Sequence, residues 1–136
     1  MELVDAMAVS ASGMKAQGAR VRVIAENIAN ANSIAEGPGQ EPYRRKLITF
    51  RNELDRASGV DMVKANRIIL DESPFGLKFE PNHPYADDDG YIRTPNVKTT
   101  IEMMDMRQAT RAYEANLNAI GAARSMLQRT VELLRS

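Results

Sequence analysis

The sequence contains no cysteine and no tryptophan, and only 5% of its residues are aromatic. The absence of cysteine excludes disulfides, thiol catalysis and thiolate metal sites, so the chain does not depend on the redox state of its compartment. Alanine and methionine supply much of the apolar content, and they bury less area or specify shape less firmly than Phe, Ile and Leu. We therefore expect a loosely packed monomer that gains stability from assembly.

The sequence also lacks an excess of charge of either sign, because 18 Lys and Arg residues balance 18 Asp and Glu residues. The middle of the chain, residues 34–95, carries nine positive and eleven negative side chains, and residues 96–136 carry six and four. Proteins that bind nucleic acid normally show a clustered excess of Lys and Arg. The charge distribution therefore predicts no nucleic-acid partner.

Long hydrophobic runs are missing as well. No stretch approaches the ~20 apolar residues that span a bilayer. Glu2 and Asp5 interrupt the start of the chain, where a secretory signal would place a continuous apolar segment. We expect no membrane span and no cleaved signal peptide, so any export would use a route that does not read such a signal.

Residues for catalysis or for metal binding are scarce. His83 is the only histidine, so a histidine-based zinc site lacks ligands, and we expect His83 to make a turn or surface contact. The acidic run that ends at Gly90 suggests a calcium loop, but the EF-hand alignment places Tyr85 and Asn96 where carboxylates are needed. We expect no catalytic residue, no cofactor and no metal. A small helical enzyme or ligand-binding protein remains the alternative, and it would need convergent polar groups in a pocket.

Both ends of the sequence carry apolar residues repeated every seven positions. Because an α-helix has ~3.6 residues per turn, this spacing returns to nearly the same face and predicts a helix that packs against another helix. The rows are Met7, Met14, Val21 and Ile28, then Met106, Tyr113, Ile120, Leu127 and Leu134, with companions at Val4, Ala11, Gly18, Ala25, Met103, Leu117 and Val131. We expect helices at residues 2–32 and 97–134 that pair within the chain and leave apolar strips for neighbouring chains.

Three residues of the first predicted helix are unfavourable there. Gly13 and Gly18 each cost ~1 kcal/mol relative to Ala, so they indicate either a surface where another backbone approaches closely or a locally weakened helix. Asn27 also has low helix propensity, and a side-chain amide that bonds to a neighbouring helix would compensate for this. A further asparagine, Asn30, fits the left-handed geometry of a helix end.

The middle segment, residues 34–95, has turn signals and short strand-like runs. We expect strands at residues 44–50, 60–63, 67–70 and 75–79, then a loop that returns to Asn96, which is the predicted N-cap of the last helix.

The basic cluster Arg44-Arg45-Lys46 indicates a charged strand edge or an acidic contact on a partner. The predicted fold is mainly α, with long terminal helices (1–33 and 96–136) paired as a coiled-coil-like unit around a small irregular antiparallel β region.

Several segments resemble one protein family, and they cover nearly the whole chain. The first is AVSASGMKAQGARVRVIAENIANANS at residues 8–33, and the others are GPGQEPYRRK at 37–46, DESPF at 71–75, PNHPYADDDGYIRTPNV at 81–97 and EMMDMRQATRAYEANLNAIGAARSMLQRTVELLR at 102–135. Together they resemble the rod and hook proteins of the bacterial flagellum. Another rod or hook protein, or a type III needle-type subunit, remains an alternative, although the short middle segment argues against a hook or distal rod protein.

The resemblance implies a function for the heptad rows. Proteins of this family are exported unfolded by the flagellar type III apparatus and polymerise into a hollow rod, which crosses the periplasm and transmits torque. Their terminal helices line the export channel, and the partners are further copies and other rod proteins, with basal-body ring proteins as additional candidates. The predicted assembly residues are Met7, Met14, Val21, Asn27, Ile28, Asn30, Met106, Tyr113, Leu117, Ile120, Leu127 and Leu134.

Overall fold

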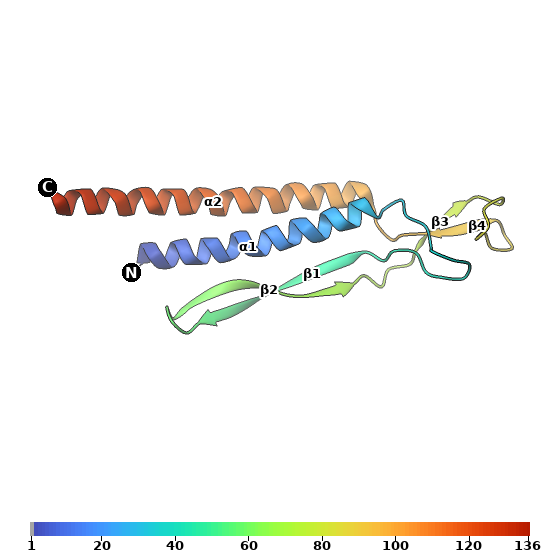
Figure 1. Cartoon of the computed structure of the whole chain (residues 1–136), viewed down its shortest axis with the longest axis horizontal. Coiled ribbons are helices and arrows are strands. Elements are labelled where there is room, and N and C mark those ends of the chain that lie inside the picture. The colour runs from blue at the N-terminus through green and yellow to red at the C-terminus, as the bar shows by residue number, and fades with distance from the viewer. Residues whose placement is uncertain (1) are drawn as a thin grey trace. The chain divides into compact units, whose positions relative to one another are not determined.

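The computed structural model describes residues 2–136 as two long helices and four strands (Figure 1). The elements are α1 (Glu2–Ala29), β1 (Lys46–Asp55), β2 (Val60–Leu70), β3 (Gly76–Phe79), β4 (Tyr91–Thr94) and α2 (Thr99–Arg135). A mainly α fold with a small β region is thereby confirmed. Contacts divide the chain into two compact units: unit 1 comprises the described residues up to Val21 with Thr49–Arg67 and Arg107–Ser136, and unit 2 comprises Arg22–Ile48 and Ile68–Met106.

Helix α1 ends three residues earlier than the sequence predicts. Residues 30–32 form a turn, in which the side chain of Asn30 donates a hydrogen bond to the carbonyl of Glu26 (2.8 Å). The hydroxyl of Ser33 donates to the carbonyl of Asn30 (2.8 Å). Such side-chain bonds compete with the helical ladder, and they explain why the helix stops at Ala29. The bounds of α2 differ from the expected residues 97–134 by two residues or fewer.

Within unit 1, α1 and α2 run antiparallel. A methyl group on Gly13 would lie 2.8 Å from Nδ2 of Asn116, and one on Gly18 would lie 4.0 Å from the ring of Tyr113. Arg20 donates a hydrogen bond to the side chain of Gln108 (3.2 Å). Gly13 therefore provides a close approach between the helices, as predicted, but the group that it admits is a side chain and not a backbone.

The buried face of α2 differs from the predicted one. A row at seven-residue spacing, formed by Glu102, Ala109, Asn116 and Ala123, is buried or half-buried. Met106, Ile120 and Leu127 of the predicted row are half-buried, whereas the predicted companions Met103, Leu117 and Val131 are 52%, 49% and 47% exposed. On α1 the companions Val4, Ala11 and Ala25 are exposed as well. Except for Gly18, which lies at the helix contact, the companions were therefore wrong as intrachain packing positions.

The strands form two separate two-stranded sheets. β1 and β2 are joined by a tight turn, in which the amide of Gly59 donates to the carbonyl of Asp55 (2.7 Å). The runs expected at 60–63 and 67–70 are parts of the single strand β2. β3 pairs antiparallel with β4, from Gly76 opposite Thr94 to Phe79 opposite Tyr91. Residues 91–94 were predicted to lie in a loop, and this prediction is wrong.

Two glycines allow a prediction that separates backbone strain from crowding. Gly59 (φ 72°) and Gly90 (φ 87°) both have the left-handed conformation, but only Gly90 is crowded: a methyl group there would lie 2.9 Å from Phe79 and 3.1 Å from Pro81. Gly59→Ala should lower the free energy of unfolding by about 1 kcal/mol through strain alone. Gly90→Ala should cost roughly 1 kcal/mol more, because the methyl group overpacks its site. Denaturant titration measures both, and equal losses would contradict the crowding argument.

Candidate functional site

A cluster of polar side chains is buried in unit 2, and it is formed by Asn27, Tyr43, Arg45, Asp71 and Glu102. We call these five residues the polar cluster. Asn27 and Glu102 are 1% and 0% exposed, and they are the largest side chains under 2% exposed among the described residues. Buried polar groups are costly unless every donor and acceptor is satisfied. The hydrogen bonds of the cluster therefore decide whether it stabilises the fold.

The amide of Asn27 is fully satisfied within the chain. Its Nδ2 donates to the carbonyl of Lys46 (2.9 Å) and to Oε2 of Glu102 (3.2 Å). Its Oδ1 accepts from the backbone amide of Lys46 (2.9 Å) and from the hydroxyl of Tyr43 (2.7 Å). The expectation that this amide bonds to a neighbouring helix is confirmed, because Glu102 belongs to α2.

The guanidinium of Arg45 contacts three carboxylates. Its Nε donates to Oε1 of Glu102, its Nη1 lies 3.2 Å from Oδ2 of Asp71, and its Nη2 lies 3.4 Å from Oδ2 of Asp105. Glu102 accepts at both of its oxygens, since Oε2 receives the amide of Asn27. Planar guanidinium groups suit such convergent contacts better than an ammonium group does. Arg45 and Glu102 thus form the charged centre of the cluster.

The basic run at residues 44–46 was expected at a strand edge or against an acidic partner, and its side chains contact groups of their own chain. Arg44 donates to the carbonyl of Asp71 (2.9 Å) and stacks 4.2 Å above the centre of the Phe75 ring. Lys46 forms an ion pair with Glu26 at 2.5 Å. All three basic side chains therefore have partners in their own chain, where acids and carbonyls distant in the sequence are available.

Asn96 is not the N-cap of α2, which begins three residues later at Thr99. Its Oδ1 accepts the backbone amide of Arg45 (2.7 Å), and its Nδ2 donates to the carbonyls of Asp71 (3.0 Å) and Ser73 (3.1 Å). The predicted role is wrong, because the side chain of Asn96 forms hydrogen bonds with groups distant in the sequence and not with the first turn of α2.

His83 makes the turn contact expected of it: its Nδ1 accepts a hydrogen bond from the backbone amide of Tyr85 (3.0 Å).

The cluster shifts the pKa of three of its members. Against the opposing effect of burial, contacts with Glu102 and Asp71 raise the pKa of Arg45. Burial, together with the nearby charges of Glu26 and Glu102, raises the pKa of Tyr43 to about 12. Hydrogen bonds from the hydroxyl and the amide of Ser73, and then the contact with Arg45, lower the pKa of Asp71. The phenol is thus held neutral and the carboxyl is held ionised, which are the states that their hydrogen bonds require.

The sequence did not single out Glu102, although a signal was present. An acidic residue in the first turn of a helix is favourable for electrostatic reasons alone, so it attracts no further explanation. However, Glu102 lies seven residues before Ala109 and continues the buried row of α2 toward its start. A charge within an otherwise small and uncharged row indicates a buried ion pair.

The predicted assembly residues fall into three groups. Asn27 lies in the interior of unit 2, where its amide bonds within the chain. The half-buried residues are Met7, Met14, Val21, Ile28, Asn30, Met106, Ile120 and Leu127. Tyr113, Leu117 and Leu134 are 38%, 49% and 82% exposed. The structure therefore leaves these three available for contact with other molecules.

Helix α2 exposes a large amount of apolar surface in unit 1. Besides Tyr113, Leu117 and Leu134, the side chains of Met126, Val131 and Leu133 are each about half exposed or more. We call these six residues the apolar surface of α2. These side chains lie on more than one face of the helix, and exposed apolar side chains in such number favour contact with other molecules. This exposure is the strongest indication of an assembly surface in unit 1.

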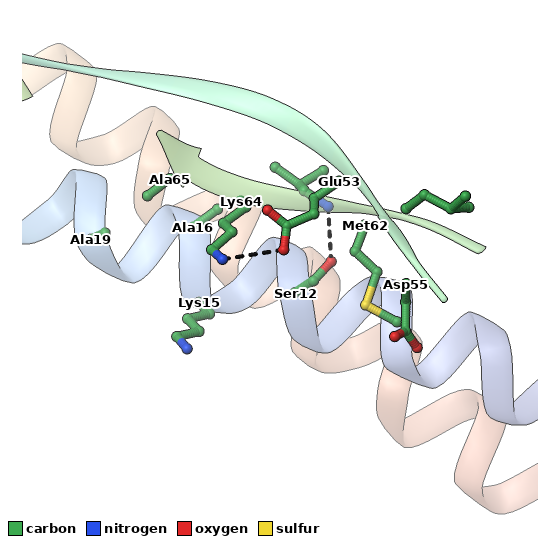
Figure 2. Close-up of a pocket in the computed structure, with 11 residues that line it drawn as sticks. Ser12, Lys15, Ala16, Ala19, Glu53, Asp55, Met62, Lys64 and Ala65 are labelled. Atoms are coloured by element: carbon green, nitrogen blue, oxygen red, sulfur yellow. Dashed lines mark hydrogen bonds and ion pairs between the residues drawn. The ribbon is translucent and has the colours of Figure 1, made fainter. Parts of the chain in front are cut away.

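A groove of about 440 Å³ lies between α1 and the strands β1 and β2 in unit 1 (Figure 2). Its lining comprises Ser12, Lys15, Ala16 and Ala19 of α1, with residues 53–55 of β1 and residues 62–65 of β2. The hydroxyl of Ser12 accepts the backbone amide of Val63 (3.2 Å), and Lys64 lies 3.2 Å from Glu53 across the two strands. The first contact attaches β2 to α1, and the second joins the two strands beside the groove.

No helix among residues 2–136 is long and apolar enough to cross a bilayer. In the same residues, no group of three or more His, Cys, Asp or Glu side chains is placed to hold a metal ion.

Replacement of Glu102 tests the polar cluster. Glu102→Gln keeps the shape of the side chain but removes the charge that faces Arg45, so the free energy of unfolding should fall by about 3 kcal/mol. Glu53→Gln is the matched control, because it breaks an exposed ion pair with Lys64 and should leave stability unchanged. Chemical denaturation of both variants provides the comparison. Equal stability of the Glu102 variant and the native chain would show that the cluster is not stabilising.

Titration of the tyrosines tests the electrostatics. One of the four tyrosines should ionise near pH 12, because the pKa of Tyr43 is raised from 10. The unfolded chain loses this proton near pH 10, so the stabilising effect of the neutral phenol is complete below pH 10 and is lost as pH approaches 12. The ultraviolet absorbance of phenolate monitors ionisation, and Tyr43→Phe should remove only the late transition. A single transition near pH 10 in the native chain would refute this assignment.

Comparison with known proteins identifies the family to which the chain belongs. The family model "Flagella basal body rod protein" matches residues 7–34, and "Flagellar basal body rod FlgEFG protein C-terminal" matches residues 88–133. The flagellar basal-body rod protein FlgC of Agrobacterium fabrum is 44% identical over 134 residues, which cover 98% of this chain and 96% of the relative.

More distant relatives share the same extent of similarity. FlgC of Salmonella typhimurium is 35% identical over 133 residues, with 98% of both chains covered. FlgC of Bacillus subtilis is 33% identical over 148 residues, with 98% of this chain and 99% of the relative covered. The chain therefore belongs to the FlgC family of flagellar basal-body rod proteins.

Proposed function

We propose that this structural subunit of the flagellar basal-body rod polymerises through its terminal helices into a hollow axial tube. The tube would enclose the export channel and transmit motor torque across the periplasm. The observation that carries this proposal is the apolar surface of α2, which includes Leu133 and Leu134 at 76% and 82% exposed. Nothing in the described part of unit 1 covers these two side chains.

The energetics favour burial of this surface between subunits. Fully burying one Leu or Val side chain stabilises a complex by ~1.5 to 3 kcal/mol, before the cost of ordering the partners is subtracted. Six such side chains on one helix thus supply a substantial driving force for association. Contacts that repeat between identical subunits along a filament also resist torsion collectively.

We also propose that α1 and α2 pair as a short antiparallel coiled coil. The row Met106, Tyr113, Ile120 and Leu127 has the heptad spacing that such packing requires, and Gly13 admits the side chain of Asn116. The terminal regions 1–33 and 96–136 would then form the wall of the tube, and the middle region 34–95 would lie outside it. In this arrangement Asn27 and Asn30 act within the subunit by fixing the end of α1.

Export by the flagellar type III apparatus is the route that we propose for delivery to the rod. The membership of the chain in a family of flagellar basal-body rod proteins supports this route. Other rod proteins, the export apparatus and the basal-body rings are the partners that this route and location imply.

Leu117 provides the test of assembly. Its side chain is 49% exposed, so Leu117→Ala should leave the stability of the monomer nearly unchanged, while it removes apolar area from the proposed contact. We expect reduced motility in soft agar and fewer complete rods by electron microscopy. Asn118→Ala is the matched control at the adjacent exposed position of α2 and should have no effect. Normal rods and motility in the Leu117 variant would argue against assembly through this face.

A further inference from the structure

Methionine carries all of the sulfur in this chain, because the sequence has eight methionines and no cysteine. Three methionines are more than half exposed, and all three lie on α2: Met103 (52%), Met104 (66%) and Met126 (56%). The other methionines among residues 2–136 are half-buried: Met7, Met14, Met62 and Met106. A thioether reacts only with an oxidant that can reach it, so these exposures separate an accessible set from a less accessible one.

The helix around Met126 leaves its side chain uncovered. Methionine side chains on a helix lean toward the preceding turn, and the residues there, at spacings of three and four, are Ala123 and Ala122. A methyl group is too short to cover a thioether. On the following turn, the hydroxyl of Thr130 donates its hydrogen bond to the backbone carbonyl of Met126 (2.9 Å). The side chain of Met126 is therefore accessible to small solutes in unit 1.

Met126 also belongs to the apolar surface of α2. Leu133, another member, is seven residues later and therefore on nearly the same face of the helix. Leu133 is 76% exposed, so the two side chains form one exposed apolar row. A change that makes Met126 polar therefore alters the surface that we propose for assembly.

Hydrogen peroxide produces such a change. A lone pair of the sulfur atom forms a bond to one peroxide oxygen, and the O–O bond breaks. The departing hydroxide takes up the proton of the transferred oxygen and leaves as water, so the sulfur loses two electrons and the peroxide gains them. The product is methionine sulfoxide, in which a polar S–O group replaces the apolar thioether.

We propose that Met126 is an oxidation site, and that its sulfoxide prevents the subunit from entering the rod. This inference rests on the proposed assembly function, because the sulfoxide acts where the apolar surface of α2 is buried between subunits. A sulfoxide oxygen in such a contact gives up its hydration without gaining a hydrogen-bond donor, which opposes association. The monomer itself tolerates the change, because the side chain of Met126 is more than half exposed before assembly.

Peptide mapping by mass spectrometry tests the accessibility. The purified full chain is treated with hydrogen peroxide, and sulfoxide formation is followed at each methionine. In the folded chain, Met126 should oxidise several-fold faster than Met14 and Met62, which are half-buried. In guanidinium chloride the rates should become equal, because unfolding exposes every thioether. Equal rates in the folded chain would overturn the inference.

Substitution of Met126 tests the consequence for assembly. Met126→Gln places a polar group of similar length at the site, as oxidation does, whereas Met126→Leu is the matched control that keeps an apolar side chain of similar volume. We expect a several-fold loss of complete rods by electron microscopy for Met126→Gln and normal rods for Met126→Leu. Circular dichroism verifies that both chains fold. Equal numbers of rods in the two strains would contradict the inference.

Growth in sublethal hydrogen peroxide tests oxidation and assembly together. Cells with Met126→Leu should build several-fold more complete rods than cells with the native chain, because leucine has no sulfur to oxidise. Oxidation of other proteins affects both strains alike, so the comparison isolates position 126. An equal loss of rods in the two strains would count against the inference.

The Leu117 variant distinguishes failure of this inference from failure of the proposed function. Normal rods in Met126→Gln, together with fewer rods in Leu117→Ala, would overturn only the inference. Normal rods in both variants would overturn the inference and the proposed assembly through α2 together. Fewer rods in both variants, with normal rods in Met126→Leu, is the result that we expect.

Discussion

The contact between Arg45 and Glu102 is the interaction on which unit 2 depends. Glu102 is 0% exposed, and an ionised carboxylate at such a depth is tolerable only when its charge and its lone pairs are matched. One oxygen accepts the guanidinium of Arg45, and the other accepts the amide of Asn27. Because Asn27 also holds the backbone of Lys46, one carboxylate connects α1, β1 and α2. Removing Arg45 or Asn27 takes a hydrogen-bond donor from this buried carboxylate.

Unit 1 is organised by a different constraint, namely the size of the side chains between its helices. Ala109 and Ala123 are buried, and Gly13 accommodates the amide of Asn116, so the two helices approach closely. The larger apolar side chain of Leu117 is consequently displaced from this contact and remains exposed. The same small residues that pair the helices thus create the surface that we assign to assembly.

The sequence predicted what periodicity and local chemistry determine. The heptad rows predicted both helices, and Asn27 was recognised because a polar side chain interrupted an apolar pattern. Its partner Glu102 was not predicted, since the two residues are 75 positions apart and one sequence carries no information on pairs. β4 was missed because four residues between Gly90 and Pro95 are too few to show alternation. Asn96 was misassigned because cap preferences are local, whereas carbonyls of Asp71 and Ser73 compete for its amide.

The separation of the polar cluster along the chain also has a kinetic consequence. Arg45 precedes Glu102 by 57 residues. Glu102 therefore becomes available to Arg45 only after the whole middle segment of the chain has been synthesised. Closing so long a loop carries an entropic cost before any contact offsets it, which slows folding relative to local helix formation. Until α2 arrives, Asn27 and Arg45 remain hydrated and the N-terminal segments stay pliable. The last helix to emerge is thus the one that completes unit 2.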